Sequence, residues 1–247
     1  MTRDEILRLI IDGRTDLVTE LMKQDGWRES LAAPFPNPID WFIYYNDTTA
    51  LRLVHDRGGA IPFETLGARL NSAAFFGHWK VCDFLLGLGA DPNHQLPRSR
   101  ETALHSALCK ANRPHFIYTV RVLLDHGANP NAQTADNMPT DAFMRDVRTR
   151  GETPLHRAAA YADPEIIRLL LDRGADKERR DAHGDTPLGW ASMHLRPGSV
   201  LALLAYGDHR ISQKQVSELT SDHGAGWGNG MERNLMGGYR PLSSTED

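Results

Sequence analysis

Cysteine is scarce in this sequence of 247 residues, which contains only Cys82 and Cys109. Two cysteines cannot build a disulfide framework, and these two form no paired metal-ligand motif such as Cys-x-x-Cys. We therefore expect both side chains to be small buried residues of a protein that works in a reducing compartment.

Long apolar runs and a strong excess of one charge are also lacking. No stretch approaches the roughly 18 uninterrupted apolar residues of a membrane helix, and the opening Met-Thr-Arg-Asp-Glu lacks the layout of a secretory signal. The chain has 28 Lys and Arg against 32 Asp and Glu, which argues against a general binder of nucleic acid or acidic membranes. We expect a cytoplasmic protein that binds neither nucleic acid nor membranes.

Motifs of catalysis and metal binding are missing as well. The 11 histidines form no His-Glu-x-x-His motif, and the Gly-x-Ser-x-Gly motif of a serine nucleophile does not occur. The glycine-rich run 224–230 lacks the Gly-Lys-Ser/Thr of a phosphate-binding loop, and we interpret it as a flexible linker. We accordingly expect no catalytic residue, no metal and no cofactor.

A repeated segment is present in the middle of the chain. Residues 153–159, Thr-Pro-Leu-His-Arg-Ala-Ala, recur 33 residues later as Thr-Pro-Leu-Gly-Trp-Ala-Ser, and residues 102–108 read Thr-Ala-Leu-His-Ser-Ala-Leu. An apolar stretch and a glycine follow each copy, as in Leu-Leu-Leu-Asp-Arg-Gly-Ala-Asp at 169–176. A fixed period of this length indicates a solenoid rather than a single globular core.

The residues of the repeated segment suit two short helices joined by a turn. Thr153 can cap the first helix, and Pro154 occupies the first turn, where no amide donor is needed. The alanines allow neighbouring helices to approach closely, and Gly174 tolerates the left-handed conformation that ends the second helix. Each copy is therefore predicted to be a helix-turn-helix unit.

These segments resemble the ankyrin repeat, whose pattern is a Thr-Pro-Leu-His-x-Ala-Ala opening, two short antiparallel helices and a Gly-Ala-Asp turn into a hairpin loop. The resemblance implies an all-α repeat solenoid of helix-turn-helix repeats with β-hairpin or loop fingers. It also implies that the motif histidines, His105 and His156, form hydrogen bonds with neighbouring backbone. With weaker copies included, about six repeats cover residues 2–207 and start near residues 4, 37, 68, 102, 153 and 186.

Two segments depart from the pattern. The fourth repeat takes 51 residues to reach the fifth, and most of the excess enlarges a hairpin at 132–150 that carries Met138, Phe143 and Met144. Long loops with apolar residues are often functional, although such side chains can instead dock on a neighbouring repeat. The second segment, 208–247, is expected to hold a C-terminal capping helix and the Gly-rich tail.

The ankyrin resemblance also implies which positions face a concave groove, namely the residue after the motif histidine and the residues before the turn between helices. Aromatic and basic residues, which carry much of the energy of protein interfaces, are frequent there. Together with the enlarged hairpin, the expected partner-binding residues are Trp41, Tyr45, Phe76, Lys110, Phe143, Arg145, Arg157, Tyr161, Trp190 and His194. The alternative is that several aromatic residues, Phe75 and Trp41 above all, fill space between repeats.

The sequence thus predicts a module that binds another protein or peptide. Arginines at successive hairpin tips suggest a partner with an acidic patch, although neighbouring carboxylates offset much of their charge. A stoichiometric inhibitor of an enzyme or toxin, such as an immunity protein, would use the same surface. A less favoured alternative is an enzyme that combines the enlarged loop and the tail with Asp181, His183 or His223.

Overall fold

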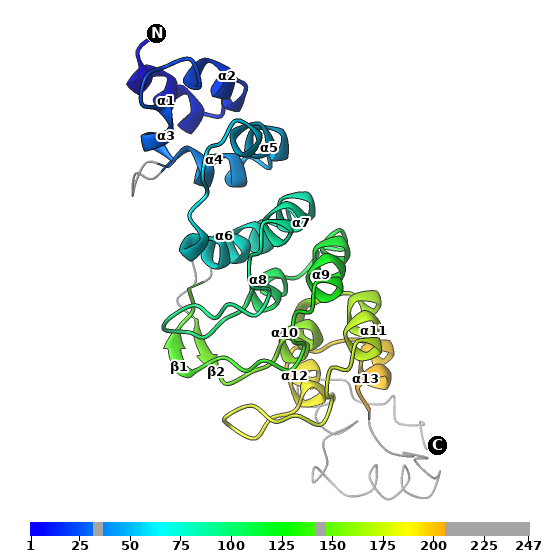
Figure 1. Cartoon of the computed structure of the whole chain (residues 1–247). Helices are drawn as coiled ribbons and strands as arrows, with labels where there is room; N and C mark the ends of the chain where they lie inside the picture. The colour runs from blue at the N-terminus through cyan, green and yellow to red at the C-terminus, as the bar shows by residue number, and fades with distance from the viewer. Residues whose placement is uncertain (32–36, 142–146, 206–247) are drawn as a thin grey trace, which may run out of the picture. The chain divides into compact units, whose positions relative to one another are not determined.

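Paired short helices make up most of the structure, a computed structural model that describes residues 1–31, 37–141 and 147–205 (Figure 1). Residues Met1–Leu204 form one compact unit, and a second begins at Ala205. Six pairs of a first and a second helix occur within the described residues, together with the short α3 (Trp27–Ser30). The pairs are α1 (Arg3–Ile11) with η1 (Thr15–Leu17) and α2 (Val18–Leu21), α4 (Pro38–Tyr44) with α5 (Thr48–Asp56), α6 (Phe63–Phe76) with α7 (Trp79–Gly87), α8 (Ala103–Ala107) with α9 (Phe116–Asp125), α10 (Pro154–Tyr161) with α11 (Pro164–Asp172), and α12 (Pro187–Met193) with α13 (Gly198–Leu204).

Local signals start and end these helices. The Thr186 hydroxyl accepts a hydrogen bond from the Gly189 amide at 3.3 Å, and the Asn37 side chain accepts one from the Ile39 amide at 3.0 Å. Proline follows each cap, where its fixed φ suits the first turn. Gly77 ends α6 with φ 77°, a left-handed conformation that glycine adopts without steric cost.

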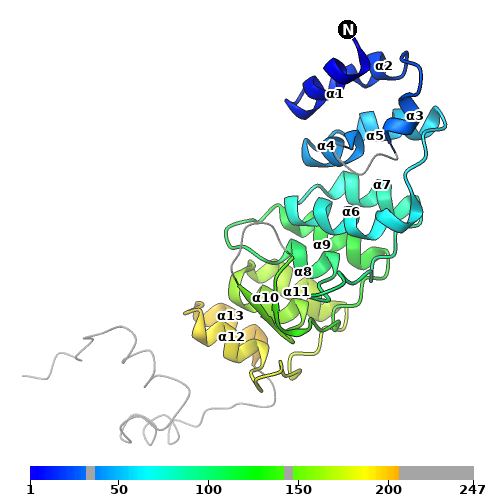
Figure 2. The same ribbon diagram turned by 90° about the vertical axis from the view of Figure 1, so that its left-hand side faces the viewer.

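Each pair packs on the next in chain order, as Figure 2 shows. First helices contact first helices, as in α4 with α6 and α10 with α12, and second helices contact second helices, as in α7 with α9. Leu70, Leu104 and Leu155 from the first helices are fully buried between the pairs. Burial of one such side chain contributes about 1.5–3 kcal/mol, so the pairs stabilise one another rather than folding alone. The expected all-α repeat solenoid is confirmed.

The enlarged hairpin at 132–150 contains the two strands of a small antiparallel sheet, β1 (Asp136–Pro139) and β2 (Arg148–Arg150). Asp136 lies opposite Arg150, and Pro139 lies opposite Arg148. Backbone hydrogen bonds join this hairpin to the loop before α8 and to the loop before α12, which are the neighbouring fingers. The Ala135 amide donates to Ser99 O at 2.7 Å, and the Ala182 amide donates to Arg150 O at 2.8 Å. The described strands of the hairpin are therefore held between the segments that contain Ser99 and Ala182.

The repeat start expected near residue 68 lies within α6, which begins at Phe63, after Pro62 and with the acidic Glu64 in its first turn. The capping helix and Gly-rich tail predicted for 208–247, and the hairpin residues Phe143, Met144 and Arg145, lie outside the described residues.

Candidate functional site

A buried arginine lines a hollow between α10, α12 and the enlarged hairpin. Arg157, on α10, is only 6% exposed. Its Nε and Nη2 donate to Oε1 of Glu152 at 2.8 and 2.6 Å, and Nη2 also lies 2.7 Å from Oε1 of Glu101. Its Nη1 donates to the carbonyl oxygen of His105 at 3.1 Å. All three guanidinium nitrogens are therefore bonded inside the protein.

The electrostatics of this cluster favour the charged forms of all its members. Burial by itself would raise the pKa of Glu152, but the Arg157 guanidinium and a hydrogen bond from Thr134 outweigh it and lower the pKa to about 2. The same balance of burial against Arg157 lowers the pKa of Glu101. Burial also opposes the charge of Arg157, yet the two glutamates raise its pKa. The cluster is a buried ion-pair network with net negative charge.

Glu101 also anchors the enlarged hairpin. Its carboxylate accepts hydrogen bonds from the Thr140 hydroxyl and from the Asp141 amide, each at 2.8 Å. The Asp141 carboxylate in turn accepts from Arg98 Nη2 at 3.1 Å and from the Ser99 amide at 3.3 Å. Thr140 and Asp141, which follow β1, are thus joined to the loop before α8 by hydrogen bonds and an ion pair of charged side chains.

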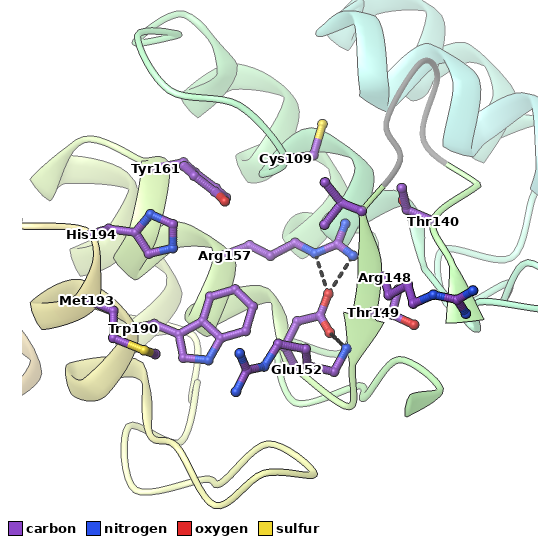
Figure 3. A pocket seen from close by; sticks show the side chains of 12 residues that line it. Cys109, Thr140, Arg148, Thr149, Glu152, Arg157, Tyr161, Trp190, Met193 and His194 are labelled. Atoms are coloured by element: carbon purple, nitrogen blue, oxygen red, sulfur yellow. Dashed lines mark hydrogen bonds and ion pairs between the residues drawn. The ribbon is translucent and has the colours of Figure 1, made fainter. Parts of the chain in front are cut away.

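The hollow beside Arg157 is a pocket of about 220 Å³ (Figure 3). One side is formed by α10 and α12, and the facing side by the end of the enlarged hairpin, including β2. Arg157 lies between the two sides, and Cys109, which follows α8, also lines the pocket. Its lining residues are Cys109, Thr140, Val147, Arg148, Thr149, Arg150, Glu152, Arg157, Tyr161, Trp190, Met193 and His194.

Aromatic rings form the helical side of the pocket. The ring of His194 contacts Tyr161 edge-on at 5.0 Å between centroids and stacks on Trp190 at 6.3 Å. Trp190 is 8% exposed, and its indole nitrogen donates to Asp181 at 3.0 Å. The exposed Met193 completes this side. The wall is apolar, and a hydrogen bond holds its largest ring in place.

A second group of aromatic rings lies at the ends of α4 and α6. Tyr44, which is 49% exposed, contacts Trp41 at 5.7 Å, Tyr45 at 5.0 Å and Phe76 at 5.2 Å between centroids. The Tyr45 hydroxyl donates to Ile11 O at 2.8 Å, so the helix pair that contains α1 is also joined to this group. Phe76 also stacks on His78, at 5.5 Å. These rings form a partly exposed aromatic patch.

Phe75 and Cys109 connect the two groups. The ring of Phe75 contacts Phe76 at 5.2 Å and packs with the buried Cys109, which also lines the pocket. The Lys110 ammonium lies 4.8 Å from the centre of the Phe75 ring, a cation–π distance. We call the resulting set the aromatic strip; its members are Trp41, Tyr44, Tyr45, Phe75, Phe76, Cys109, Tyr161, Trp190 and His194.

The structure groups the predicted binding residues and corrects one of them. Trp41, Tyr45, Phe76 and Lys110 gather near α4, α6 and α8, and Tyr161, Trp190 and His194 gather at the pocket. Arg157 was expected on an open face, but it is buried and its guanidinium donors bind Glu101, Glu152 and the His105 carbonyl. The reason is that an acidic residue precedes the capping threonine both in the repeat of Arg157, at Glu152, and in the repeat before it, at Glu101, and both carboxylates contact the arginine. Phe143 and Arg145 lie outside the described residues.

Sequence reasoning missed Glu101 and Glu152, although the chain contains a signal for them. Glu101, Glu152 and Asp185 each come directly before the capping threonine of a repeat. Asp185 makes the equivalent kind of contact, an ion pair with Arg150 Nη2 at 2.9 Å. A recurring acidic residue at this position indicates a role in joining the repeats. The partly exposed Val147 has no such signal, because nothing in its local sequence places it at a pocket.

The motif histidines have the structural role that the resemblance implied. Nδ1 of His105 accepts a hydrogen bond from the Thr102 amide at 3.2 Å, and its Nε2 lies 3.2 Å from Glu152 O. His156 repeats this arrangement with Thr153 at 3.1 Å and Asp185 O at 3.0 Å. Burial, followed by repulsion from Arg157, lowers the pKa of His105 to about 4, so the ring stays neutral at pH 7.

The residues of the alternative enzyme hypothesis are engaged in structural contacts where they are described. The buried Asp181 accepts hydrogen bonds from Trp190 Nε1 and from the amides of His183 and Asp185. His183 Nε2 lies 3.2 Å from Asp136. His223 lies outside the described residues.

The described part of the chain holds neither a metal-ligand cluster nor a membrane-spanning helix. Within it, no three His, Cys, Asp or Glu side chains come together in a way that would hold a metal ion. None of its helices combines the length and apolar character needed to span a bilayer.

Comparison with known proteins identifies the repeat. The family model for ankyrin repeats matches in three copies, over residues 70–181 and 138–215. Rabankyrin-5 of human and of mouse is 30% identical over 168 residues, which cover 60% of this chain and 14% of the relative. Human ankyrin repeat and SOCS box protein 3 is 32% identical over 162 residues, or 64% of this chain and 28% of the relative. The chain thus matches less than a third of the length of these relatives.

The matched residues include the three clearest copies of the repeated segment, the second helices that follow them and the enlarged hairpin. The period, the capping threonines, the motif histidines and the stacked helix pairs agree with the family model. The chain belongs to the ankyrin-repeat family.

Proposed function

We propose that this chain binds a partner protein or peptide along the aromatic strip and the facing enlarged hairpin. Ankyrin repeats are in general protein-interaction modules. The observation that carries the proposal is the series of side-chain contacts from Trp41 on α4 through Phe76 and Phe75 to Cys109, which lines the same pocket as Trp190. Aromatic side chains held on a rigid scaffold are the residues that contribute most to protein interfaces.

Exposure of apolar groups along the strip supports a binding role. Tyr44 is 49% exposed, Tyr45 is 40% exposed and Met193, beside Trp190, is 43% exposed. Such side chains gain free energy when a partner removes them from water, by about 25 cal/mol for each Å² of apolar surface. Their neighbours Trp41, Phe75 and Trp190 are largely buried and hold them in fixed positions, which lowers the entropy cost of binding.

The charged side chains beside the strip favour an acidic partner. Lys110 and Arg148 appear in no ion pair among the described residues, and Arg113 uses one guanidinium nitrogen to donate to Phe75 O at 2.9 Å. A carboxylate on the partner would neutralise these cations and speed association. We propose this partner rather than a nucleic acid, because the chain has 28 Lys and Arg against 32 Asp and Glu and so lacks the excess of positive charge that nucleic-acid binding uses.

The hydrogen bonds that the buried carboxylates accept fit a binding role better than a catalytic one. Glu101, Glu152 and Asp181 each accept several hydrogen bonds from the protein itself. A general base needs a lone pair that can reach a substrate proton. These carboxylates hold repeats and hairpin together instead.

Affinity capture with two matched variants tests the proposal. Tyr44→Ala removes an exposed ring of the aromatic strip, and Tyr118→Ala removes an exposed ring of α9, which contacts Trp79 and lies outside the strip. We expect a specific partner to be captured by the wild type and by Tyr118→Ala, and at least about tenfold less by Tyr44→Ala. Equal loss with both variants, or no loss with either, would refute the strip as the binding surface.

The identity of the captured partner then separates an adaptor from an inhibitor. A single enzyme whose activity falls in proportion to added chain, and recovers with Tyr44→Ala, indicates stoichiometric inhibition. Partners whose activities do not respond to the chain indicate an adaptor.

A further inference from the structure

The pocket beside Arg157 has features that specify what kind of group it can hold. This inference rests on the proposed function, because it concerns one site within the proposed binding surface. The pocket has a volume of about 220 Å³. An apolar cavity of about 150 Å³ accommodates a benzene ring, whereas pockets for drug-sized molecules are usually larger than about 300 Å³. The size therefore suits one large side chain of a partner.

The floor of the pocket favours an aromatic ring. Each guanidinium nitrogen of Arg157 already has an oxygen acceptor, from Glu101, Glu152 or the His105 carbonyl. An entering carboxylate would therefore find the edge of the guanidinium occupied. Arg157 is nevertheless among the residues that line the pocket, and the plane of a guanidinium stacks favourably on an aromatic ring.

The walls favour the same kind of occupant. Trp190, Tyr161 and Met193 line the helical side, and Val147, 53% exposed, lines the side of the hairpin. Rings pack well against rings and against methionine sulfur. The exposed Val147 and Met193 would lose contact with water when a ring enters between them.

The rim carries positive charge. Arg148 is exposed and donates to the Asn137 carbonyl at 2.7 Å, and no carboxylate pairs with it in the described part of the chain. Lys110 follows the lining residue Cys109 in the chain, and its ammonium group lies over the ring of Phe75. Both cations can meet residues that flank an inserted ring, so the charge complementarity selects acidic flanking residues.

We propose that this pocket binds one aromatic side chain of a partner segment whose neighbouring residues are acidic. The ring inserts between Tyr161 and Val147 and stacks on Arg157. The flanking carboxylates contact Arg148 and Lys110.

Titration with blocked peptides tests the proposal. The probes are Glu-Asp-Phe-Glu-Asp, the same peptide with Ala in place of Phe, and Lys-Lys-Phe-Lys-Lys. Binding is followed by NMR on the full chain through the indole N–H signal of Trp190. We expect the first peptide to shift this signal, and the other two to bind at least about tenfold more weakly. No shift at millimolar concentration, or equal binding of the Phe and Ala peptides, would overturn the proposal.

Matched variants locate the binding on the protein. Met193→Ala and Val147→Ala should each weaken binding of the Phe peptide several-fold, whereas Leu195→Ala, an exposed apolar residue outside the pocket lining, should not. Arg148→Gln should reduce the preference for the acidic over the basic peptide, and Arg121→Gln, on the exposed face of α9, should leave it unchanged. Equal effects of variants and controls would contradict the assignment.

The two proposals can fail separately. If partner capture depends on Tyr44 while the Phe peptide leaves the Trp190 signal unchanged, the aromatic strip remains the binding surface and the pocket inference is wrong. If the peptide binds at the pocket while capture does not depend on Tyr44, the strip is wrong and the pocket stands.

Discussion

Arg157 and Glu101 belong to different repeats, yet Nη2 of the arginine lies 2.7 Å from Oε1 of the glutamate. The same glutamate holds Thr140 and Asp141 of the enlarged hairpin. This single contact therefore links α10, the finger before α8 and the hairpin that forms one side of the pocket.

Removal of the arginine charge should destabilise the fold strongly. Arg157→Met leaves Glu101 and Glu152 buried without their cation, and breaking a buried pair in this way costs about 3–5 kcal/mol. Urea unfolding followed by circular dichroism measures the loss. Arg121→Met, at an exposed position of α9, is the control and should change the free energy of unfolding by less than about 0.5 kcal/mol. Addition of Glu101→Gln and Glu152→Gln to Arg157→Met should recover part of the loss.

Loss of the Glu101 charge alone should loosen the hairpin. In Glu101→Gln the side chain can accept only one of the two hairpin hydrogen bonds, from the Thr140 hydroxyl or the Asp141 amide. We expect faster hydrogen exchange at Asp141, with unchanged exchange in the distant helix α5. Unchanged exchange at Asp141 would contradict the anchoring role.

Stability should fall continuously as the pH is lowered from neutral. The folded pKa of His105, about 4, lies below its ordinary value of 6.5, so its contribution is complete above pH 6.5 and is lost as the pH falls toward 4. The folded pKa of Glu152, about 2, lies below its ordinary value of 4.5, so its contribution is lost between about pH 4.5 and 2. Both losses have the same sign because the unfolded chain binds more protons.

Urea unfolding at a series of pH values checks this prediction. We expect a decrease on the order of a few kcal/mol between pH 7 and pH 4. His105→Asn should lower stability at pH 7 and flatten the curve between pH 6.5 and 4. A wild-type curve that rises on acidification would refute the assignment.

Two glycines in the left-handed conformation should respond differently to alanine. A Cβ at Gly77 would lie 2.5 Å from Cε2 of Phe116, whereas a Cβ at Gly174 would meet no atom within 4 Å. Gly174→Ala should therefore cost only the backbone strain, about 1–2 kcal/mol, and Gly77→Ala about 1–3 kcal/mol more because Phe116 must move. Thermal or urea unfolding of the two variants gives the difference directly.

The sequence by itself determined the repeat architecture. The Thr-Pro start, the alanines and the terminal glycines act on residues within the same helix or turn, so their spacing is sufficient to predict helix pairs around residues 102, 153 and 186. The period shows that such pairs stack, since one pair alone cannot bury its apolar face. The motif histidines also act locally, at the capping threonine three positions before them.

Only the tertiary structure decided which side chains meet across repeats. Arg157 occupies a position that the repeat pattern assigns to the surface, but it pairs with Glu152 of its own repeat and with Glu101 of the repeat before. Stacking brings Glu101, which is distant in sequence, within ion-pair distance. Phe75 and Cys109, which are far apart in sequence, likewise pack together only because the helix pairs stack. Burial and charge pairing depend on such distances in space. A sequence pattern indicates them only where the same residue type recurs at one position of the repeat.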